Sequence, residues 1–142
     1  MIAIDSNVFI YFLESNDEFG PTSLALFKKI EQSSFNAVAS ELIFFEVLAS
    51  SKIDHRDIEK YSETIRRIDV TFKPTTKEIY LEAARLRRQC ALGAMDAIHV
   101  ATAIVSGATH FVTNDKKLLK RAVAEIELVS LQDWHDSITV SV

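Results

Sequence analysis

The feature that most constrains the fold of this chain is its alternation of short apolar segments with longer amphipathic ones. Segments typical of β-strands lie at residues 1–5, 35–39, 69–73, 110–113 and 127–131. Helical periodicity is present at residues 6–13, 22–32, 40–50, 54–68, 75–90, 95–106 and 116–123. This alternation predicts an α/β fold with a mainly parallel central sheet covered by helices, and functional groups at the carboxyl ends of the strands.

Local signals predict where several of these elements begin and end. Ser6 is a candidate N-cap for the first helix, and Thr75 with Glu78 has the spacing of a capping box. Pro74 should end the preceding strand, and Gly107 stands where the helix at 95–106 should end.

Composition favours one globular domain over residues 1–142. The chain is 48% hydrophobic and contains only 3 Gly and 2 Pro, which argues against disorder, and no repeat or linker divides it. The single cysteine, Cys90, excludes an internal disulfide and a Cys-based zinc site. Because no apolar run reaches the roughly 18 residues of a membrane span and the first residues lack a signal-peptide pattern, we expect a cytoplasmic protein with no membrane partner.

Four acidic residues stand in surroundings where a lone carboxylate is costly. Asp5 closes the first strand, Asp115 follows the strand at 110–113, and Glu46 and Asp96 lie in strongly apolar helices. Helix capping by Asp5, solvent exposure of Glu46 and a helix N-terminal position of Asp115 are simpler explanations for each acid alone. Taken together, four carboxylates suit a hard cation such as Mg²⁺ or Mn²⁺.

Several segments resemble motifs of the PIN-domain family. These are IDSNVFIYFL (4–13), SELIFFEVLAS (40–50), GAMDAIHVATAIVSGATHFVTNDKKL (93–118) and VSLQDW (129–134). Within the family, the VapC-type toxin ribonucleases are the most similar. The resemblance covers essentially the whole chain, and implies a three-layer α/β/α fold and a Mg²⁺- or Mn²⁺-dependent endoribonuclease. It also implies a cognate antitoxin protein and a homodimer.

The resemblance assigns roles to individual residues. The catalytic and metal-binding acids would be Asp5, Glu46, Asp96 and Asp115. Supporting polar roles fall to Ser6, Asn7, Thr113 and Asn114. Glu41 is the alternative to Glu46, because both lie in the same apolar segment.

Other functions remain open at this stage. A processing nuclease that is not a toxin, or a non-catalytic PIN-like binding module, has the same motifs. A phosphatase with an aspartyl nucleophile is disfavoured, because it needs D-x-D where this chain has Asp5-Ser6-Asn7. His99 lies one turn after Asp96, but a helical histidine near a core is more often structural.

The net charge of −4 does not exclude an RNA substrate, because the charges are unevenly distributed. Residues 1–51 carry 2 basic and 7 acidic side chains, residues 52–90 carry 10 and 7, and residues 91–142 carry 4 and 6. Arg85 and Arg88 share a helix face in the basic middle and are the predicted RNA contacts. An antitoxin would dock on apolar residues of the early helices, drawn from Phe9, Tyr11, Phe12, Leu13, Phe19, Phe44 and Phe45.

Overall fold

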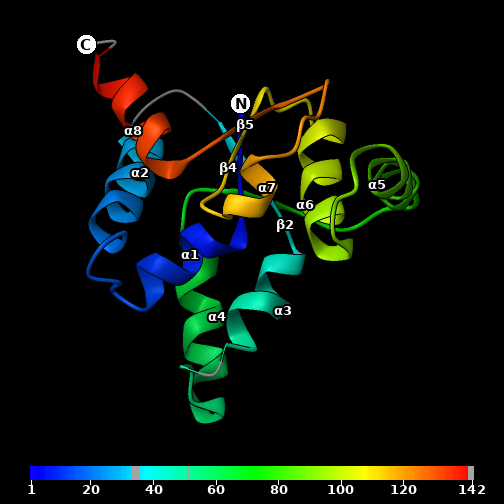
Figure 1. The fold of residues 1–142 in the computed structure, drawn as a ribbon. Helices are drawn as coiled ribbons and strands as arrows, with labels where there is room; N and C mark the ends of the chain where they lie inside the picture. Colours follow the sequence, from blue (N-terminus) through cyan, green and yellow to red (C-terminus); the bar gives the residue numbers. More distant parts are fainter. Residues whose placement is uncertain (33–35, 51, 141–142) are drawn as a thin grey trace.

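The computed structural model describes residues 1–32, 36–50 and 52–140, and its centre is a five-stranded parallel sheet (Figure 1). The strands are β1 (Ile2–Ile4), β2 (Ala37–Ser40), β3 (Thr71–Lys73), β4 (His110–Val112) and β5 (Glu127–Val129). Their order in the sheet is β3-β2-β1-β4-β5, and every neighbouring pair is parallel. The predicted mainly parallel sheet is therefore confirmed.

Eight α-helices and one short 3₁₀ helix connect the strands within the described residues. They are α1 (Ser6–Leu13), α2 (Gly20–Gln32), α3 (Leu42–Leu48), η1 (His55–Asp57), α4 (Ile58–Arg66), α5 (Lys77–Cys90), α6 (Ala94–Val105), α7 (Lys116–Leu119) and α8 (Leu131–Val140). Helices α1, α2, α4 and α8 lie on one side of the sheet, and α5 and α6 lie on the other (Figure 1). The arrangement is the expected three-layer α/β/α fold.

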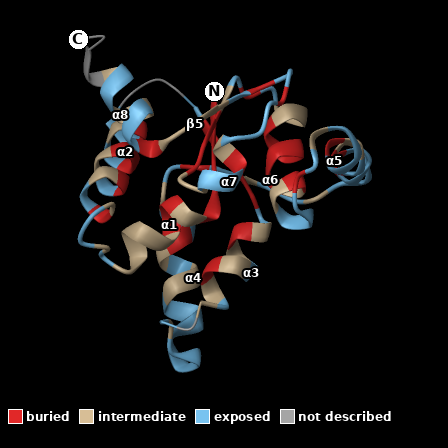
Figure 2. Ribbon diagram, in the orientation of Figure 1, coloured by how far each residue is buried: buried red, intermediate tan, exposed pale blue. Residues whose placement is uncertain are grey.

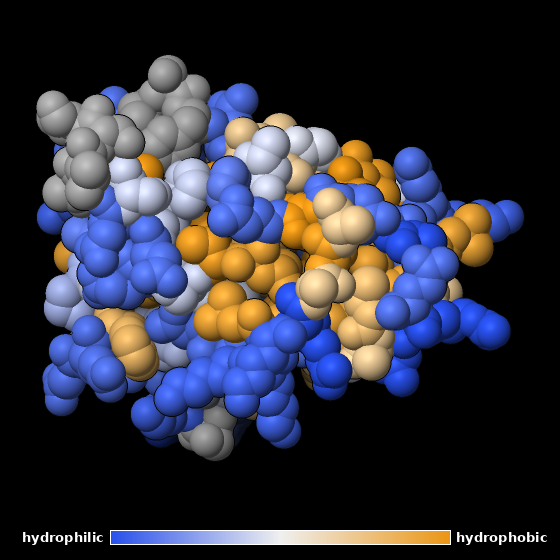
Figure 3. Space-filling model, turned by 45° about the horizontal axis from the view of Figure 1, so that its top comes forward, coloured by the Kyte–Doolittle hydropathy of each residue, from blue (hydrophilic) through white to orange (hydrophobic). Residues whose placement is uncertain are grey.

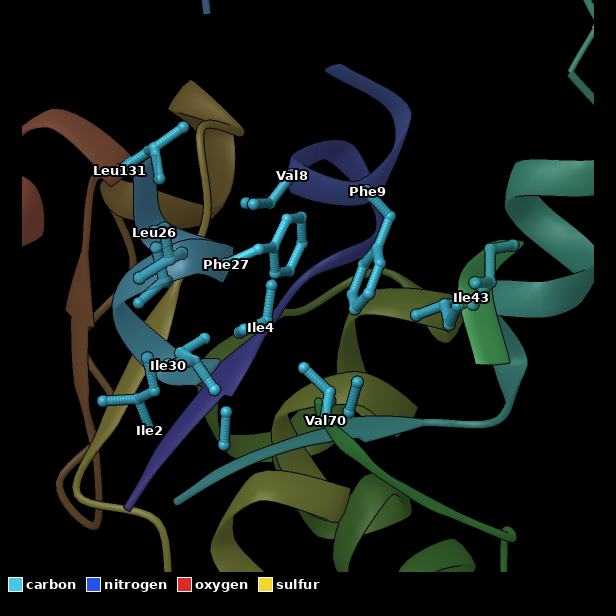
Figure 4. Packing of buried hydrophobic residues seen from close by; sticks show 14 of the residues in the cluster. Ile2, Ile4, Val8, Phe9, Leu26, Phe27, Ile30, Ile43, Val70 and Leu131 are labelled. Atoms are coloured by element: carbon cyan, nitrogen blue, oxygen red, sulfur yellow. The ribbon is translucent and has the colours of Figure 1, made fainter. Parts of the chain in front are cut away.

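The central strand supplies side chains to both of these helical layers. Ile2 and Ile4 belong to the apolar cluster beneath α1, α2 and α4, whereas Ala3 belongs to the cluster beneath α5 and α6. Figure 4 shows the first cluster, in which Phe9 and Phe27 pack with their ring centroids 5.1 Å apart. Figure 2 shows that burial concentrates on the inner strands β1, β2 and β4 and on the helix faces toward the sheet, whereas the edge strands β3 and β5 are exposed or half-buried. Burial on both faces explains why the inner strands β1 and β2 are almost wholly apolar in sequence.

The strand order places the ends of β1 and β4 side by side at the point where the chain changes direction across the sheet. The chain builds β2 and β3 on one side of β1 and then returns to build β4 and β5 on the other side. In open parallel sheets a crevice forms at this switch point, outside the carboxyl ends of the strands. Asp5 follows β1 there, and Thr113 follows β4.

Some predicted element boundaries were wrong. The cap of α1 is Asp5 rather than Ser6, and the cap of α5 is Thr76 rather than Thr75. Thr76 has extended backbone angles, and its hydroxyl accepts a hydrogen bond from the Ile79 amide at 3.3 Å. Glu78 therefore lies two residues after the cap rather than three, and no capping box forms.

The last helix of the structure was not predicted. The strand expected at 127–131 ends at Val129, and α8 begins at Leu131. The Ser130 hydroxyl accepts a hydrogen bond from the Asp133 amide at 3.1 Å, which is an N-terminal signal that the sequence contained. Phe35, the predicted start of the second strand, lies outside the described residues. Among the described residues, no helix combines the length and apolar character that crossing a bilayer requires.

Candidate active site

Asp5 is buried at the end of β1, and both of its carboxylate oxygens accept hydrogen bonds. Oδ1 accepts from the Ser6 amide at 2.8 Å, which caps α1, and Oδ2 accepts from the Thr113 hydroxyl at 2.8 Å. The capping explanation is therefore correct, but it accounts for only one oxygen. Burial raises the pKa of Asp5, while the charge of His99 and the hydrogen bonds from Thr113 and Ser6 oppose this rise.

The supporting polar residues join α1 to the end of β4. The Asn7 side chain donates to the Thr113 hydroxyl at 3.1 Å, and its carbonyl oxygen accepts from the Asn114 amide at 3.2 Å. The Asn114 side chain in turn accepts from the Leu131 amide at 3.0 Å. Ser6 is buried beside Asp5. The structure thus brings all four predicted supporting residues together around the first acid.

Asp115 begins α7 at the same end of the sheet. Its Oδ1 atom accepts hydrogen bonds from the amides of Lys117 at 2.9 Å and Leu118 at 3.2 Å, as an N-cap does. Its own amide donates to the Thr113 hydroxyl at 3.1 Å. Thr113 therefore contacts both Asp5 and Asp115 and fixes the two acids relative to each other.

Asp96 lies in the first turn of α6, where the negative charges of the other acids affect its pKa. Burial raises its pKa from 3.8 to about 6, and the negative charges of Asp5, Asp115 and Glu46 add to this rise, whereas His99 opposes it. Carboxylates shift one another's pKa in this way when they share a small volume. The other three predicted acids therefore lie near enough to Asp96 to affect its pKa.

Glu46 reaches this group from α3 and contacts His99. The His99 Nε2 atom meets the Glu46 carboxylate, and the His99 side chain is buried. Burial alone would lower the pKa of His99, but the hydrogen bond with Glu46 and the nearby charges of Asp5, Glu46 and Asp96 outweigh it, so this pKa is raised. Glu41 is exposed at the start of α3, and no side-chain hydrogen bond is found at that cap. The geometry thus favours Glu46 over Glu41.

The chemistry of these side chains fits a divalent cation of the Mg²⁺ or Mn²⁺ type. All four acids supply oxygen donors, which hard cations prefer, and their mutual repulsion is what a bound cation relieves. Within residues 1–32, 36–50 and 52–140, no three His, Cys, Asp or Glu side chains are close enough to form a ready-made ligand cluster. The four acids therefore lie in one region of the molecule, but no three of these described side chains surround a common point.

Two residues near the acids were not assigned to the site from the sequence. His99 is one of them: the sequence favours a structural role for it, although it lies one turn after Asp96 and so on the same side of α6. Tyr11, one turn after Asn7 on α1, is the second. Burial raises the pKa of Tyr11, a hydrogen bond with the Asn114 side chain opposes this, and the charges of Asp5 and Asp115 are among the groups that raise it.

The two arginines predicted to contact RNA, Arg85 and Arg88, differ in whether their side chains are paired within the chain. Arg85 is paired with Glu82, and lies 2.9 Å from Glu125, near the start of β5. Its guanidinium also donates to Gln89 at 2.7 Å. Arg88 is exposed on the same helix. The donors of Arg85 are therefore engaged within the chain, and Arg88 is the member of the pair that faces solvent.

The sequence matches the family model of the PIN domain over residues 2–124. The chain therefore belongs to the PIN domain family. No curated protein matches it in sequence.

Solved structures with the same fold include toxins of toxin–antitoxin pairs. A toxin–antitoxin complex from Klebsiella pneumoniae has a TM-score of 0.70 at 16% identity, over 92% of this chain and 98% of that one. VapBC2 from Rickettsia felis, bound to a DNA fragment from its promoter, has a TM-score of 0.66 at 16% identity, with the same coverage. VapC20 from Mycobacterium tuberculosis, a toxin that cleaves the sarcin–ricin loop, has a TM-score of 0.65 at 14% identity, over 86% of this chain and 97% of that one. At these identities the likeness shows the fold.

Proposed function

We propose that this protein is a Mg²⁺- or Mn²⁺-dependent endoribonuclease and the toxin of a toxin–antitoxin pair. The observation that carries the proposal is the convergence of acids from separate elements at the switch point of the sheet. The Thr113 hydroxyl hydrogen-bonds both Asp5 and the Asp115 amide, and His99, one turn after Asp96, contacts Glu46. The negative charges of Asp5, Asp115 and Glu46 all raise the pKa of Asp96. Membership of the PIN domain family and the fold shared with VapC20, a toxin that cleaves the sarcin–ricin loop, support the assignment.

The chain's own residues would hold and orient the reacting groups. Asp5, Asp96 and Asp115 would hold the cation, and Glu46 would complete the ligand set or orient the attacking water. A divalent cation bound there supplies an activated water and neutralises charge on the phosphoryl oxygens. Thr113 would keep Asp5 and Asp115 in position through its hydrogen bonds to both at 2.8 and 3.1 Å. No histidine base is needed for this chemistry.

The test is RNA cleavage by the purified full chain, followed by mapping of the new RNA ends. We expect cleavage that EDTA abolishes and that Mg²⁺ or Mn²⁺ restores. Asp5→Asn and Asp96→Asn should each lower the rate by at least about 100-fold, because each removes a charge from the cation site. Asp133→Asn, which removes an exposed acid of α8, is the matched control and should keep the full rate.

The outcomes separate the alternatives. If both variants cleave RNA as fast as the wild type, the four-carboxylate mechanism is wrong. Binding of Mn²⁺ without hydrolysis of any RNA would identify a non-catalytic module. An acid-stable fluoroaluminate or fluoroberyllate adduct at Asp5 would identify the phosphatase instead.

A candidate docking surface for the antitoxin lies on α1, α2 and α4. Two adjoining cavities of about 400 and 340 Å³ share Phe12 and Leu24 in their walls. Leu24 is 39% exposed, and both acidic and basic side chains border the second cavity, including Glu31 and Arg67. This groove would take an amphipathic segment of the antitoxin. Of the aromatic residues predicted for docking, Phe9 is buried in the core and Phe12 lines the groove.

A homodimer is also part of the proposal. One face of the molecule gathers apolar side chains at its centre, bordered by hydrophilic ones (Figure 3). Among the described residues, large apolar side chains such as Phe45 and Leu81 are 60% and 64% exposed. Sedimentation equilibrium of the free protein measures the oligomeric state directly.

A further inference from the structure

We propose that the exposed cations of α7 and of the two residues after it form the surface that receives the backbone phosphates of the RNA substrate. These cations are Lys116, Lys117, Lys120 and Arg121. The inference rests on the proposed ribonuclease function and specifies where the strand lies, on α7 rather than on the arginines of α5.

The position of these cations in the sequence is the first observation. They are the only lysines and arginines after position 90, and all of them fall within six residues that directly follow Asp115. Asp115 caps α7, so the backbone amide of Lys117 lies 2.9 Å from the Asp115 carboxylate. The cationic segment therefore begins at the candidate cation site itself.

The local structure turns all four side chains outward. Leu118 is buried on the inner face of α7, and Leu119 is half-buried. The four cations flank these two leucines and are all exposed. Lys116 and Lys117 lie in α7, Lys120 is its C-cap, and Arg121 follows in a turn closed by the bond from its amide to the Leu118 carbonyl, so all four cations lie within little more than one turn of chain.

None of the four cations has an ion-pair partner among the described residues. The acids that follow in the sequence are used elsewhere: Glu125 pairs with Arg85, and Glu127 pairs with His110 at 3.0 Å. An exposed cluster of like charges repels itself, and no ion pair with the described part of the chain offsets this repulsion. A polyanion supplies the missing counter-charge.

A site built from carboxylates also needs a cationic surface beside it, because RNA is an anion. The site's four carboxylates repel a phosphodiester, and before a cation binds they give this end of the sheet a negative potential. Affinity for RNA comes largely from lysine and arginine contacts to the backbone. Cations placed directly beside the acids hold the strand while the scissile phosphate reaches the site.

The test compares two matched double variants of the full chain. Lys116→Gln/Lys117→Gln removes two neighbouring cations from α7, and Arg87→Gln/Arg88→Gln removes two from α5. All four residues are exposed, so both variants should unfold at the wild-type temperature. Binding of a fluorescein-labelled single-stranded RNA is measured by fluorescence anisotropy in EDTA over a series of salt concentrations.

We expect the α7 variant to weaken binding by about tenfold. The slope of log K against log salt concentration should fall by roughly 0.7 for each phosphate that the variant no longer neutralises. In Mg²⁺ the same variant should raise KM for RNA cleavage and leave kcat near the wild-type value. The α5 variant should change neither the affinity nor the salt slope by more than about twofold.

Two outcomes overturn the inference. Wild-type affinity and salt slope in the α7 variant would exclude this surface, and an equal effect in both variants would show a general charge effect only. Failure of the ribonuclease proposal is distinguishable from either outcome, because it leaves the wild type unable to cleave RNA in Mg²⁺ whatever the α7 variant does to binding.

Discussion

Asp5 and Asp115 each begin a helix with one carboxylate oxygen and keep a second oxygen for another use. Asp5 Oδ1 caps α1, and its Oδ2 accepts from Thr113. Asp115 Oδ1 caps α7 through two amides. Capping orients a carboxylate and is worth about 1 kcal/mol to the helix. The structural and the proposed functional roles of these residues are therefore compatible.

The raised pKa of Asp96 predicts how the metal-free protein responds to pH. Its pKa is about 6 in the folded chain, against an ordinary value of 3.8, so the folded state binds this proton more tightly than the unfolded state does. The resulting stabilisation is fully present below about pH 4 and is lost as the pH rises through about 6. Ionised Asp96 thus destabilises the metal-free fold at neutral pH.

Thermal unfolding in EDTA checks this prediction. Asp96→Asn should melt at a higher temperature than the wild type at about pH 7.5 and should show a flatter pH dependence between about pH 4 and 6. The exposed acid Asp133 provides the control, because Asp133→Asn should change neither property. A lower melting temperature for Asp96→Asn at neutral pH would contradict the prediction.

At the scale of elements, α6 carries two groups of the site on adjacent turns. Asp96 lies in its first turn, and His99, one turn later, contacts the Glu46 carboxylate from α3. The contact joins α3 to α6 through a buried ring and orients Glu46. Partners of a metal-binding carboxylate typically change metal affinity 10- to 100-fold when they are removed.

We therefore predict that His99→Leu weakens Mn²⁺ binding by about tenfold or more, because Glu46 loses its partner. His99→Gln keeps a side-chain N–H donor and should restore much of the affinity. Mn²⁺ binding without RNA, followed by electron paramagnetic resonance, measures this effect separately from catalysis. Equal affinities in the Leu and Gln variants would show that His99 acts only through packing.

The elements differ in how far the sequence could predict them. The buried strands and the helix at 95–106 follow from long apolar patterns, and Gly107 ends that helix with a φ of 83°, which glycine adopts without strain. The choice between Thr75 and Thr76 depends on one residue's backbone angles, which no pattern specifies. Helix α8 had a cap signal at Ser130, but the apolar run before it extended the predicted strand too far.

For the candidate site, the sequence predicts where the acids lie but not which long-range contacts they make. The acids at strand ends follow from topology, since parallel strands bring their carboxyl ends to one edge. The contact between Glu46 and His99 joins residues 53 positions apart, and no local pattern reports it. Arg85 pairs locally with Glu82, three residues before it, but its second ion pair, with Glu125, is long-range in the same way.

At the scale of the whole molecule, the candidate active site and the proposed antitoxin groove use different residues. Asp5 and Asp115 lie beyond β1 and β4, and Glu46 and Asp96 lie in α3 and α6, whereas Phe12 and Leu24 of α1 and α2 line the groove. If both proposals hold, toxicity and neutralisation by a partner are separable by mutation. Controlled expression in a bacterial host is the appropriate measurement.

Expression of the wild type should stop growth and produce discrete new RNA ends, and Asp96→Asn should do neither, because it cannot hold the cation. Leu24→Asp places a charge in the apolar groove at a position that is 39% exposed, so the fold should tolerate it. This variant should remain toxic and become resistant to neutralisation by a co-expressed antitoxin. Full neutralisation of Leu24→Asp would mean that the partner binds elsewhere, and discrete RNA cleavage without growth arrest would identify a processing nuclease rather than a toxin.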